Sequence, residues 1–345
     1  MAQEKELQEV FRPRDVHMGK MKVDPEKCTG CGLCIENCLF GTWEMGDDNV
    51  PRFKEEWPCF SCHNCLVVCP TGAISVVEPY HVGSGFWATY PHPLPVMYPL
   101  QPHDANGNVD QWNEVERVVM TRRSVRNFLD KPVPEPLVRR VLEAGRFAPS
   151  SGNCQPWQFI VISDKALIDQ IDEATLGILD PLYEQYISEE GVKVLASAYQ
   201  ADPEPGNWDP RIILGGVGKS MYSRVNPPGL GAPVIIVLAA DTRSIGGFWI
   251  QIGICGQNMN LVANSLGLKA TWVGFPTLGI NGVPSLAEKL GIRPPFVAAT
   301  ALALGYPRFK QEGIVPREFR PITWFREGQE DPEIEDMPSI PEMRQ

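Results

Sequence analysis

The sequence CTGCGLCIENC at residues 28–38 has the same cysteine spacing as CFSCHNCLVVCP at residues 59–70. Both runs follow the pattern C-x2-C-x2-C-x3-C, and together they hold eight of the ten cysteines. Three thiolates at two-residue intervals can occupy three corners of an iron-sulfur cubane, whereas the fourth cysteine lies too far round the turn and reaches a different cluster. The duplication therefore supplies each of two clusters with a fourth ligand.

This pair of motifs resembles the bacterial two-cluster ferredoxins over roughly residues 20–80. The resemblance implies a small ferredoxin-like domain with two 4Fe-4S clusters and a crossed set of ligands. One cluster would be held by Cys28, Cys31, Cys34 and Cys69, and the other by Cys59, Cys62, Cys65 and Cys38. One departure is that Leu39 follows the fourth cysteine of the first run, where Pro70 follows in the second.

Paired cysteines also form zinc sites with four thiolate ligands, which is the main alternative for this region. Zinc modules pair two C-x-x-C units across a longer gap and have no use for a third cysteine at the same interval in both halves. The spacing therefore favours iron-sulfur clusters. His63 lies inside the second run as a further candidate ligand, but the motif already supplies enough thiolates, so we expect His63 to lie behind the ligands or at the surface.

A second set of chemically distinctive residues begins at TRRSVRNF, residues 121–128. Arginine side chains bind phosphate oxygens bidentately and stay protonated, although a basic run of this length is by itself typical of a solvated surface. The segment APSSGNCQPW at residues 148–157 follows the next predicted helix and precedes a predicted strand. The combination of the two segments favours a phosphate site.

The two segments in this order resemble the FMN-binding nitroreductase family over about residues 115–325. Further matches are TWVGF at residues 271–275, LGYP at residues 304–307, and the arginines at positions 317 and 320. The resemblance implies an α+β fold, in which a central mixed β-sheet is flanked by helices. It also implies a homodimer with FMN at the interface and an FMN-dependent, nitroreductase-like oxidoreductase activity.

The same resemblance implies which residues contact FMN. Those near its phosphate and ribityl chain are Arg122, Arg123, Ser124 and Arg126. Those that would approach the flavin of the other subunit are Pro149, Ser150, Ser151 and Asn153. Val273 and Gly274 would place backbone near the isoalloxazine ring, although some relatives carry glutamate at the position of Val273. Arg317 or Arg320 would close on the phosphate.

The chain divides into four predicted segments. These are a ferredoxin-like domain at residues 1–85, a proline-rich linker at 86–114, the FMN domain at 115–325 and an acidic tail at 326–345. In the FMN domain, helices are predicted at 136–148, after Asp164, at about 181–199 and at 244–268, and strands at 159–162, 233–240, 270–275 and 296–304. Residues 201–232 are rich in proline and glycine, which is typical of a lid or a disordered loop.

Composition narrows the classes of partner. The chain has 345 residues with 43% hydrophobic content, which is enough for two domains, and a formal net charge of −11, which disfavours nucleic acids and anionic membranes as partners. No charged residue lies between Ser244 and Leu268, but the amides in that segment favour a buried helix over a membrane span. Nothing marks the chain for export, so we expect it in the cytoplasm.

The sequence predicts electron transfer, because clusters carry single electrons and FMN can collect two. We expect an external ferredoxin-like donor to reduce the clusters and a small nitroaromatic, quinone or conjugated compound to be the acceptor. One alternative is an NAD(P)H-oxidising flavoprotein that exports electrons through its clusters, and another is a redox sensor or electron-transfer subunit without catalysis.

No catalytic residue is assigned. The last histidine is His103, so a proton donor in the FMN domain is a Tyr, Ser, Thr, Lys, carboxylate, water or the flavin. We expect Cys154 and Cys255 to be packed and inert.

Overall fold

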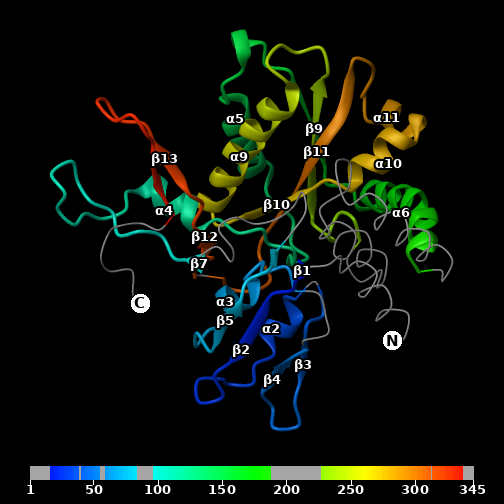
Figure 1. Cartoon of the computed structure of the whole chain (residues 1–345). Coiled ribbons are helices and arrows are strands. Elements are labelled where there is room, and N and C mark those ends of the chain that lie inside the picture. The colour runs from blue at the N-terminus through cyan, green and yellow to red at the C-terminus, as the bar shows by residue number, and fades with distance from the viewer. Residues whose placement is uncertain are drawn as a thin grey trace. The chain divides into compact units, whose positions relative to one another are not determined.

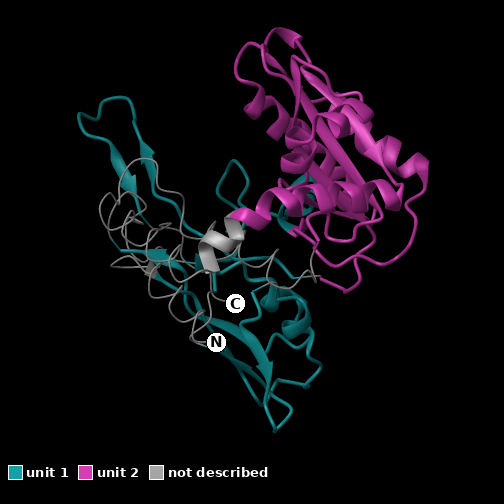
Figure 2. Ribbon diagram, turned by 90° about the vertical axis from the view of Figure 1, so that its right-hand side faces the viewer, with its two compact units in different colours: residues 1–120, 189–216, 312–345 teal, residues 121–188, 217–311 magenta. Residues whose placement is uncertain are grey.

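The computed structural model describes residues 16–38, 40–54, 59–83, 96–187, 227–311 and 313–336. Contacts divide the chain into two compact units, shown in different colours in Figure 2. Unit 1 comprises residues 1–120, 189–216 and 312–345, and unit 2 comprises residues 121–188 and 217–311. The predicted segment boundaries at 85, 114 and 325 stay predictions. Residues 201–226 of the segment predicted to be a lid or a disordered loop lie outside the described residues. Residues 337–345 of the predicted acidic tail lie outside them as well.

Unit 1 contains both cysteine runs on very short elements (Figure 1). Strand β2 (Lys20–Val23) pairs antiparallel with β5 (Ile74–Glu78), and β3 (Trp43–Met45) pairs with β4 (Pro51–Phe53). Helices α2 (Leu33–Glu36) and α3 (Asn64–Val68) each carry the third cysteine of one run. Among the described residues, the buried cluster around the cysteine runs has four members, Met21, Cys34, Trp43 and Ile74, and a second cluster has three, Met18, Tyr80 and Val82. A core this small gains little from apolar burial, so metal ligation is expected to supply much of its stability.

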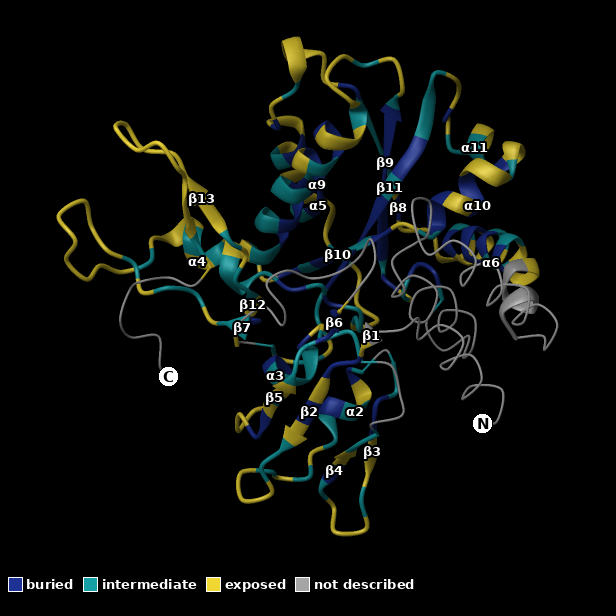
Figure 3. Cartoon of the chain, in the orientation of Figure 1, coloured by how far each residue is buried: buried dark blue, intermediate teal, exposed yellow. Residues whose placement is uncertain are grey.

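Three further pairs of short strands belong to unit 1. Strand β1 (Val16–His17) pairs with β6 (His81–Val82), and β7 (Val96–Met97) pairs with β12 (Arg317–Glu318). Strands β13 (Ile322–Trp324) and β14 (Glu333–Glu335) form an exposed hairpin, drawn in yellow in Figure 3. Helix α4 (Glu114–Thr121) ends at the boundary with unit 2.

Unit 2 is built on a four-stranded sheet in the order β10-β11-β9-β8. These strands are β10 (Lys269–Val273), β11 (Phe296–Gly305), β9 (Val234–Asp241) and β8 (Trp157–Ile162). The α+β class is confirmed, and the predicted strand positions agree with these bounds. Every pair of described strands in this sheet is antiparallel, so the parallel pairing that a mixed sheet requires is not found among them.

Helices cover both faces of this sheet (Figure 1). Alternate residues of β9 pack on opposite sides: Ile236 and Leu238 belong to one buried cluster with residues of α5 (Glu135–Arg146) and α9 (Phe248–Ser265). Ile235 and Val237 belong to a second cluster with residues of α6 (Lys165–Ile187), α10 (Pro276–Gly282) and α11 (Pro284–Lys289). Burial on both faces explains why β9 is apolar throughout rather than alternating.

Two helices of unit 2, α6 and α9, correspond to helices predicted from the sequence. A single helix, α6, runs through Pro181, where a separate helix was predicted to begin. Asp164 accepts hydrogen bonds from the backbone of Ala166 and Leu167, as expected of a helix cap. Helix α9 is the uncharged segment, and it lies against the sheet with Gln251 and Asn260 buried. Among the described residues, no helix has the length and apolar character needed to cross a membrane.

Candidate functional site

The first group of cysteines surrounds one cavity in unit 1. Cys28, Cys31, Cys34 and Cys69 all line it, together with apolar residues that include Val23 and Ile74. Burial, followed by repulsion from the thiolates of Cys31 and Cys69, raises the pKa of Cys34 to about 11. The structure therefore brings the last cysteine of the second run to the three leading cysteines of the first.

The second group shows the reciprocal arrangement. The pKa of Cys59 is raised to about 12, chiefly by burial and also by its neighbours Cys62 and Cys38. Burial also raises the pKa of Cys65 well above its ordinary value, with Cys62, Cys59 and Cys38 adding to the effect. The fourth cysteine of the first run thus lies with the second run. None of the described cysteines forms a disulfide.

These two groups fit iron-sulfur clusters chemically. Each offers four sulfur donors, and buried neutral thiols lose their protons readily only when a metal supplies compensating positive charge. Backbone hydrogen bonds already favour the thiolate of Cys69, because the amide of Ala73 donates to its Sγ at 3.2 Å. Although burial opposes the effect, hydrogen bonds from Thr71, Ala73 and Gly72 lower the pKa of Cys69.

His63 is buried beside the second group, with 5% of its surface exposed. Burial lowers the pKa of its imidazole to about 4. A hydrogen bond to the backbone of Pro316 acts in the opposite direction, and the charge of Arg317 acts in the same direction as burial. Of the two positions expected for His63, the surface position is wrong. The ring is buried, and its lowered pKa favours the neutral form at physiological pH.

The basic run 121–128 belongs to unit 2 and is only partly solvated. Arg123 is 2% exposed, and its Nη1 donates to the carbonyl of Arg122 at 2.9 Å. Burial and the charge of Arg123 lower the pKa of Lys269, at the start of β10. Two cations in one desolvated region repel each other, and an anion between them would relieve that repulsion. This region therefore fits a phosphate group, and a wholly solvated basic run is excluded.

The other residues predicted near the phosphate are more accessible. Ser124 and Arg126 are half-buried, and Nη1 of Arg126 lies 3.3 Å from the Ser124 carbonyl. Arg317 and Arg320 are both exposed and belong to unit 1, where Arg320 forms an ion pair with Glu318 at 2.6 Å. The remaining predicted FMN residues belong to unit 2.

The segment between α5 and β8 is an exposed loop that contains a short 3-10 turn, Ser151–Asn153. Pro149, Ser151 and Asn153 are exposed, and the Ser150 hydroxyl accepts a hydrogen bond from the backbone of Gln155 at 3.0 Å. The φ angles of Asn153 and Gln155 are 55° and 45°. Strained backbone in an exposed loop is typical of binding sites.

One residue that sequence reasoning missed fixes this loop. Gln251 is 3% exposed, and its Oε1 accepts hydrogen bonds from the Ser151 amide and the Cys154 thiol, both at 3.3 Å. Its Nε2 donates to the carbonyl of Ile245 at 2.7 Å. The sequence signal that could have identified Gln251 was an amide side chain in a helix that is uncharged and buried.

Cys154 is exposed, so the prediction that it is packed is wrong, whereas Cys255 is fully buried as expected.

Val273 and Gly274 lie where β10 ends. Val273 is buried, whereas Gly274 is exposed and its carbonyl accepts a hydrogen bond from the Thr277 hydroxyl at 2.7 Å. Lys269 and Val273 stand at opposite ends of the five-residue strand β10, and the four residue steps between them span about 13 Å. A ligand that reached from the basic region to Gly274 would therefore have to be extended.

Comparisons with known proteins agree with a cysteine-rich part in unit 1 and a separate basic region in unit 2. A family model described as the nitroreductase family matches residues 119–306, more than half of the chain, and one described as a 4Fe-4S dicluster domain matches residues 27–74. A putative NADH dehydrogenase/NAD(P)H nitroreductase of Methanothermobacter thermautotrophicus is 27% identical over 59% of this chain and 81% of its own length. A 4-nitrobenzoate reductase of Pseudomonas putida is 29% identical over 45% of this chain and 70% of its own length.

Among solved structures, a nitroreductase with bound FMN from Desulfitobacterium hafniense is 24% identical over 60% of this chain and 96% of its own, with a TM-score of 0.46. The predicted fusion of a two-cluster ferredoxin domain with an FMN-dependent nitroreductase domain is confirmed by the two family matches, and with it the oxidoreductase class. The chain therefore belongs to the nitroreductase family, with a 4Fe-4S dicluster domain ahead of its nitroreductase domain.

Proposed function

We propose that this chain is an iron-sulfur flavoprotein reductase that takes electrons from an external ferredoxin-like donor and reduces a small electron-poor compound. Nitroaromatic, quinone and conjugated compounds are the substrate classes. The observation that carries the proposal is the pair of four-cysteine groups in a chain of the nitroreductase family. When bound, the clusters supply one-electron carriage and FMN supplies two-electron chemistry.

The proposed ligand sets follow the two cysteine groups. The first is Cys28, Cys31, Cys34 and Cys69, and the second is Cys59, Cys62, Cys65 and Cys38. Val23 and Ile74 give the first group apolar neighbours, whereas Cys31 is exposed. The raised thiol pKa values mean that protons leave as each cluster is inserted, so cluster assembly is favoured at higher pH.

The chain's own residues give FMN its orientation in this proposal. The buried Arg123 and its neighbour Lys269 would bind the phosphate, with Arg122, Ser124 and Arg126 supporting them. Gly274, which has no side chain and is exposed, would lie near the isoalloxazine ring. A phosphate contact from Arg317 or Arg320 stays a prediction of the family resemblance.

We propose a homodimer with FMN at its interface. The exposed face of α9 supports this assembly, because Trp249 and Ile250 are 61% and 66% exposed and Ile245, just before the helix, is 62% exposed. Apolar side chains gathered in this way are typical of protein-protein contacts. The adjacent loop would then present its predicted contacts to the other subunit's flavin. Those residues are Pro149, Ser150, Ser151 and Asn153.

A second candidate is oxidation of NAD(P)H at the flavin, with electrons leaving through the clusters. The name of the Methanothermobacter relative, which includes NADH dehydrogenase and NAD(P)H nitroreductase, favours this direction of flow. A non-catalytic sensor or electron-transfer subunit is the third candidate function.

We keep the cytoplasm as the proposed location, since free cysteines persist in a reducing compartment.

The test is an anaerobic preparation analysed for iron, sulfide and FMN, followed by stopped-flow reduction with reduced ferredoxin or with NAD(P)H. We expect about eight irons and one FMN per chain, and flavin bleaching that follows bleaching of the clusters. The double variant Cys31→Ser with Cys62→Ser should abolish ferredoxin-driven flavin reduction, whereas Cys255→Ala should retain it. Rapid bleaching by a nicotinamide in that double variant would favour the second candidate. Zinc in place of iron, or no FMN, would contradict both.

A further inference from the structure

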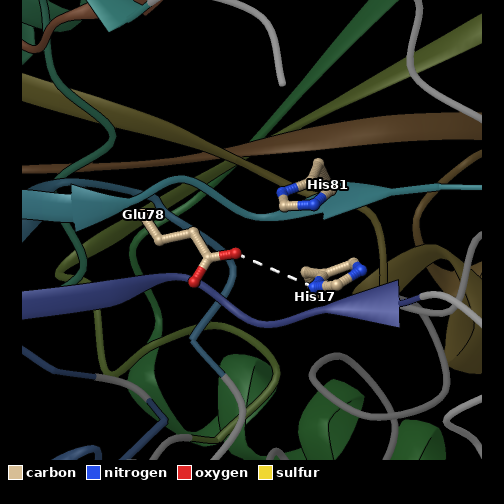
Figure 4. Close-up of side chains that lie close together, drawn as sticks. All are labelled: His17, Glu78 and His81. Carbon is tan, nitrogen blue, oxygen red and sulfur yellow. Dashed lines mark ion pairs between the residues drawn. The ribbon is translucent and has the colours of Figure 1, made fainter. Parts of the chain in front are cut away.

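Three side chains capable of binding a metal ion meet in unit 1, in a group that includes no cysteine among the described residues. His17 on β1 stands opposite His81 on β6 in the antiparallel register, and Glu78 ends β5 (Figure 4). One ligand atom from each of the three lies within 4.8 Å of the other two. His17 Nδ1 is 3.7 Å from Glu78 Oε1, and the two imidazole rings stack with centroids 4.2 Å apart.

The surroundings of His81 suit a metal ligand. The residue is 5% exposed, and its Nδ1 lies 3.1 Å from the carbonyl oxygen of Pro79. A carbonyl can only accept, so in this contact Nδ1 carries the proton and Nε2 keeps a lone pair. Ligating histidines are usually held this way, with one ring nitrogen donating to a backbone carbonyl and the other on the metal.

The other two side chains give a cation access to the site. His17 has 47% of its side chain exposed and Glu78 has 31%. Lys20 contacts the Oε2 atom of Glu78 at 3.2 Å, whereas Oε1 faces His17. One carboxylate oxygen can therefore serve the ion pair while the other binds a metal.

We propose that His17, Glu78 and His81 form a binding site for a divalent transition metal of the zinc type. Two imidazoles and one carboxylate are a ligand set that zinc uses with water in its fourth position. Bonds of about 2.0–2.1 Å at tetrahedral angles require ligand atoms about 3.3 Å apart. The group must therefore contract, and the His17 ring, which is the more exposed of the two imidazoles, would have to turn. Metal binding breaks the ring stack.

This site is adjacent to the loop of the second cysteine run. Gly19, two residues after His17, donates its amide to the carbonyl of Cys59 at 2.8 Å. Tyr80, next to His81, donates its amide to Ser61 Oγ at 2.7 Å. Two positive charges bound here would favour the reduced state of the cluster held by that loop, so occupancy should raise the potential of that cluster.

The test uses holoprotein with its iron-sulfur clusters intact, dialysed against zinc chloride. We expect one additional zinc per chain at unchanged iron content. The zinc X-ray absorption spectrum should show nitrogen and oxygen neighbours at about 2.0–2.1 Å and no sulfur at about 2.3 Å. His17→Ala and the isosteric Glu78→Gln should each weaken zinc binding at least about tenfold.

His103→Ala provides the matched control. Its Nδ1 also lies close to a backbone carbonyl two residues earlier, at 3.0 Å from Gln101, but among the described residues it belongs to no group of three ligands. This variant should bind zinc as the wild type does. Zinc held by sulfur, no added zinc in the wild type, or unchanged affinity in both His17→Ala and Glu78→Gln would overturn the proposal. Equal iron content in all variants shows that the cluster domain remains folded.

Discussion

Gly32 and His63 occupy the same position of the two cysteine runs, and both have a left-handed backbone, with φ of 73° and 56°. The residues two positions earlier, Gly30 and Ser61, repeat the relationship with φ of 68° and 52°. The duplication is therefore one of backbone shape as well as of cysteine spacing. Left-handed conformations cost a non-glycine residue about 1–2 kcal/mol, so the second run adopts this shape at a cost that the first run avoids.

The first prediction compares alanine at the two glycines. Alanine at Gly32 would meet only the end of Met45 at 3.6 Å, so Gly32→Ala should cost about 1–2 kcal/mol through backbone strain alone. Alanine at Gly30 would also collide with Asn49, whose carbonyl oxygen would lie 2.6 Å from the new Cβ. Anaerobic thermal unfolding should therefore rank wild type above Gly32→Ala, and Gly32→Ala above Gly30→Ala. Equal melting temperatures for the two variants would contradict the steric argument.

The second prediction tests the crossed ligand sets with two double variants. Cys31→Ser with Cys69→Ser removes two ligands from one group, so about four irons per chain should remain. Cys31→Ser with Cys38→Ser removes one ligand from each group, so both clusters should be lost or impaired. Iron analysis and electron paramagnetic resonance of the reduced protein measure the outcome. An uncrossed arrangement would give the reverse result for the two pairs.

Local sequence patterns predicted what depends on neighbours along the chain. Cysteine spacing predicted both motifs, and continuous apolar runs predicted β8, β9 and β11. Strands β9 and β11 are largely buried on two faces, which leaves that signature, whereas the edge strand β8 has Val161 42% exposed. Contacts over long separations were missed. Gln251 meets Ser151 across a separation of 100 residues, and nothing local distinguishes Gln251 from a neighbour such as Gln257. The burial of Arg123 and the pairing of His17 with His81 likewise depend on the tertiary fold.

The third prediction concerns Gln251 and rests on the proposed role of its loop in FMN binding. Gln251→Leu removes the acceptor shared by Ser151 and Cys154 and the donor to Ile245. The loop should lose its fixed position, and FMN affinity should fall about tenfold, since an unmet hydrogen bond costs about 1–3 kcal/mol. FMN fluorescence titration of the flavin-free protein measures the affinity. Gln257→Leu on the same helix is the control, and equal affinities in the two variants would contradict the role given to Gln251.

The fourth prediction concerns a carboxyl group in the core of unit 2. Asp172 is 6% exposed, and its Oδ1 accepts a hydrogen bond from the Gly229 amide at 2.8 Å. Burial raises the pKa of Asp172 from 3.8 to about 6, although the Gly229 amide acts in the opposite direction. Between these pH values the folded chain holds a proton that the unfolded chain has released. Stability therefore falls as the pH rises from about 4 to about 6, and this contribution is constant above that range.

Asp172→Asn keeps an oxygen for the Gly229 amide and removes the charge. Its melting temperature relative to wild type should therefore rise between pH 4.5 and pH 7.5, because only the wild type desolvates a carboxylate at the higher pH. The exposed Glu173 on the same helix supplies the control variant, Glu173→Gln, whose difference from wild type should change little with pH. Comparing each variant with wild type at the same pH cancels effects shared by all three proteins, including acid loss of iron. A pH-independent difference for Asp172→Asn would mean that Asp172 ionises as readily in the folded chain as in the unfolded one.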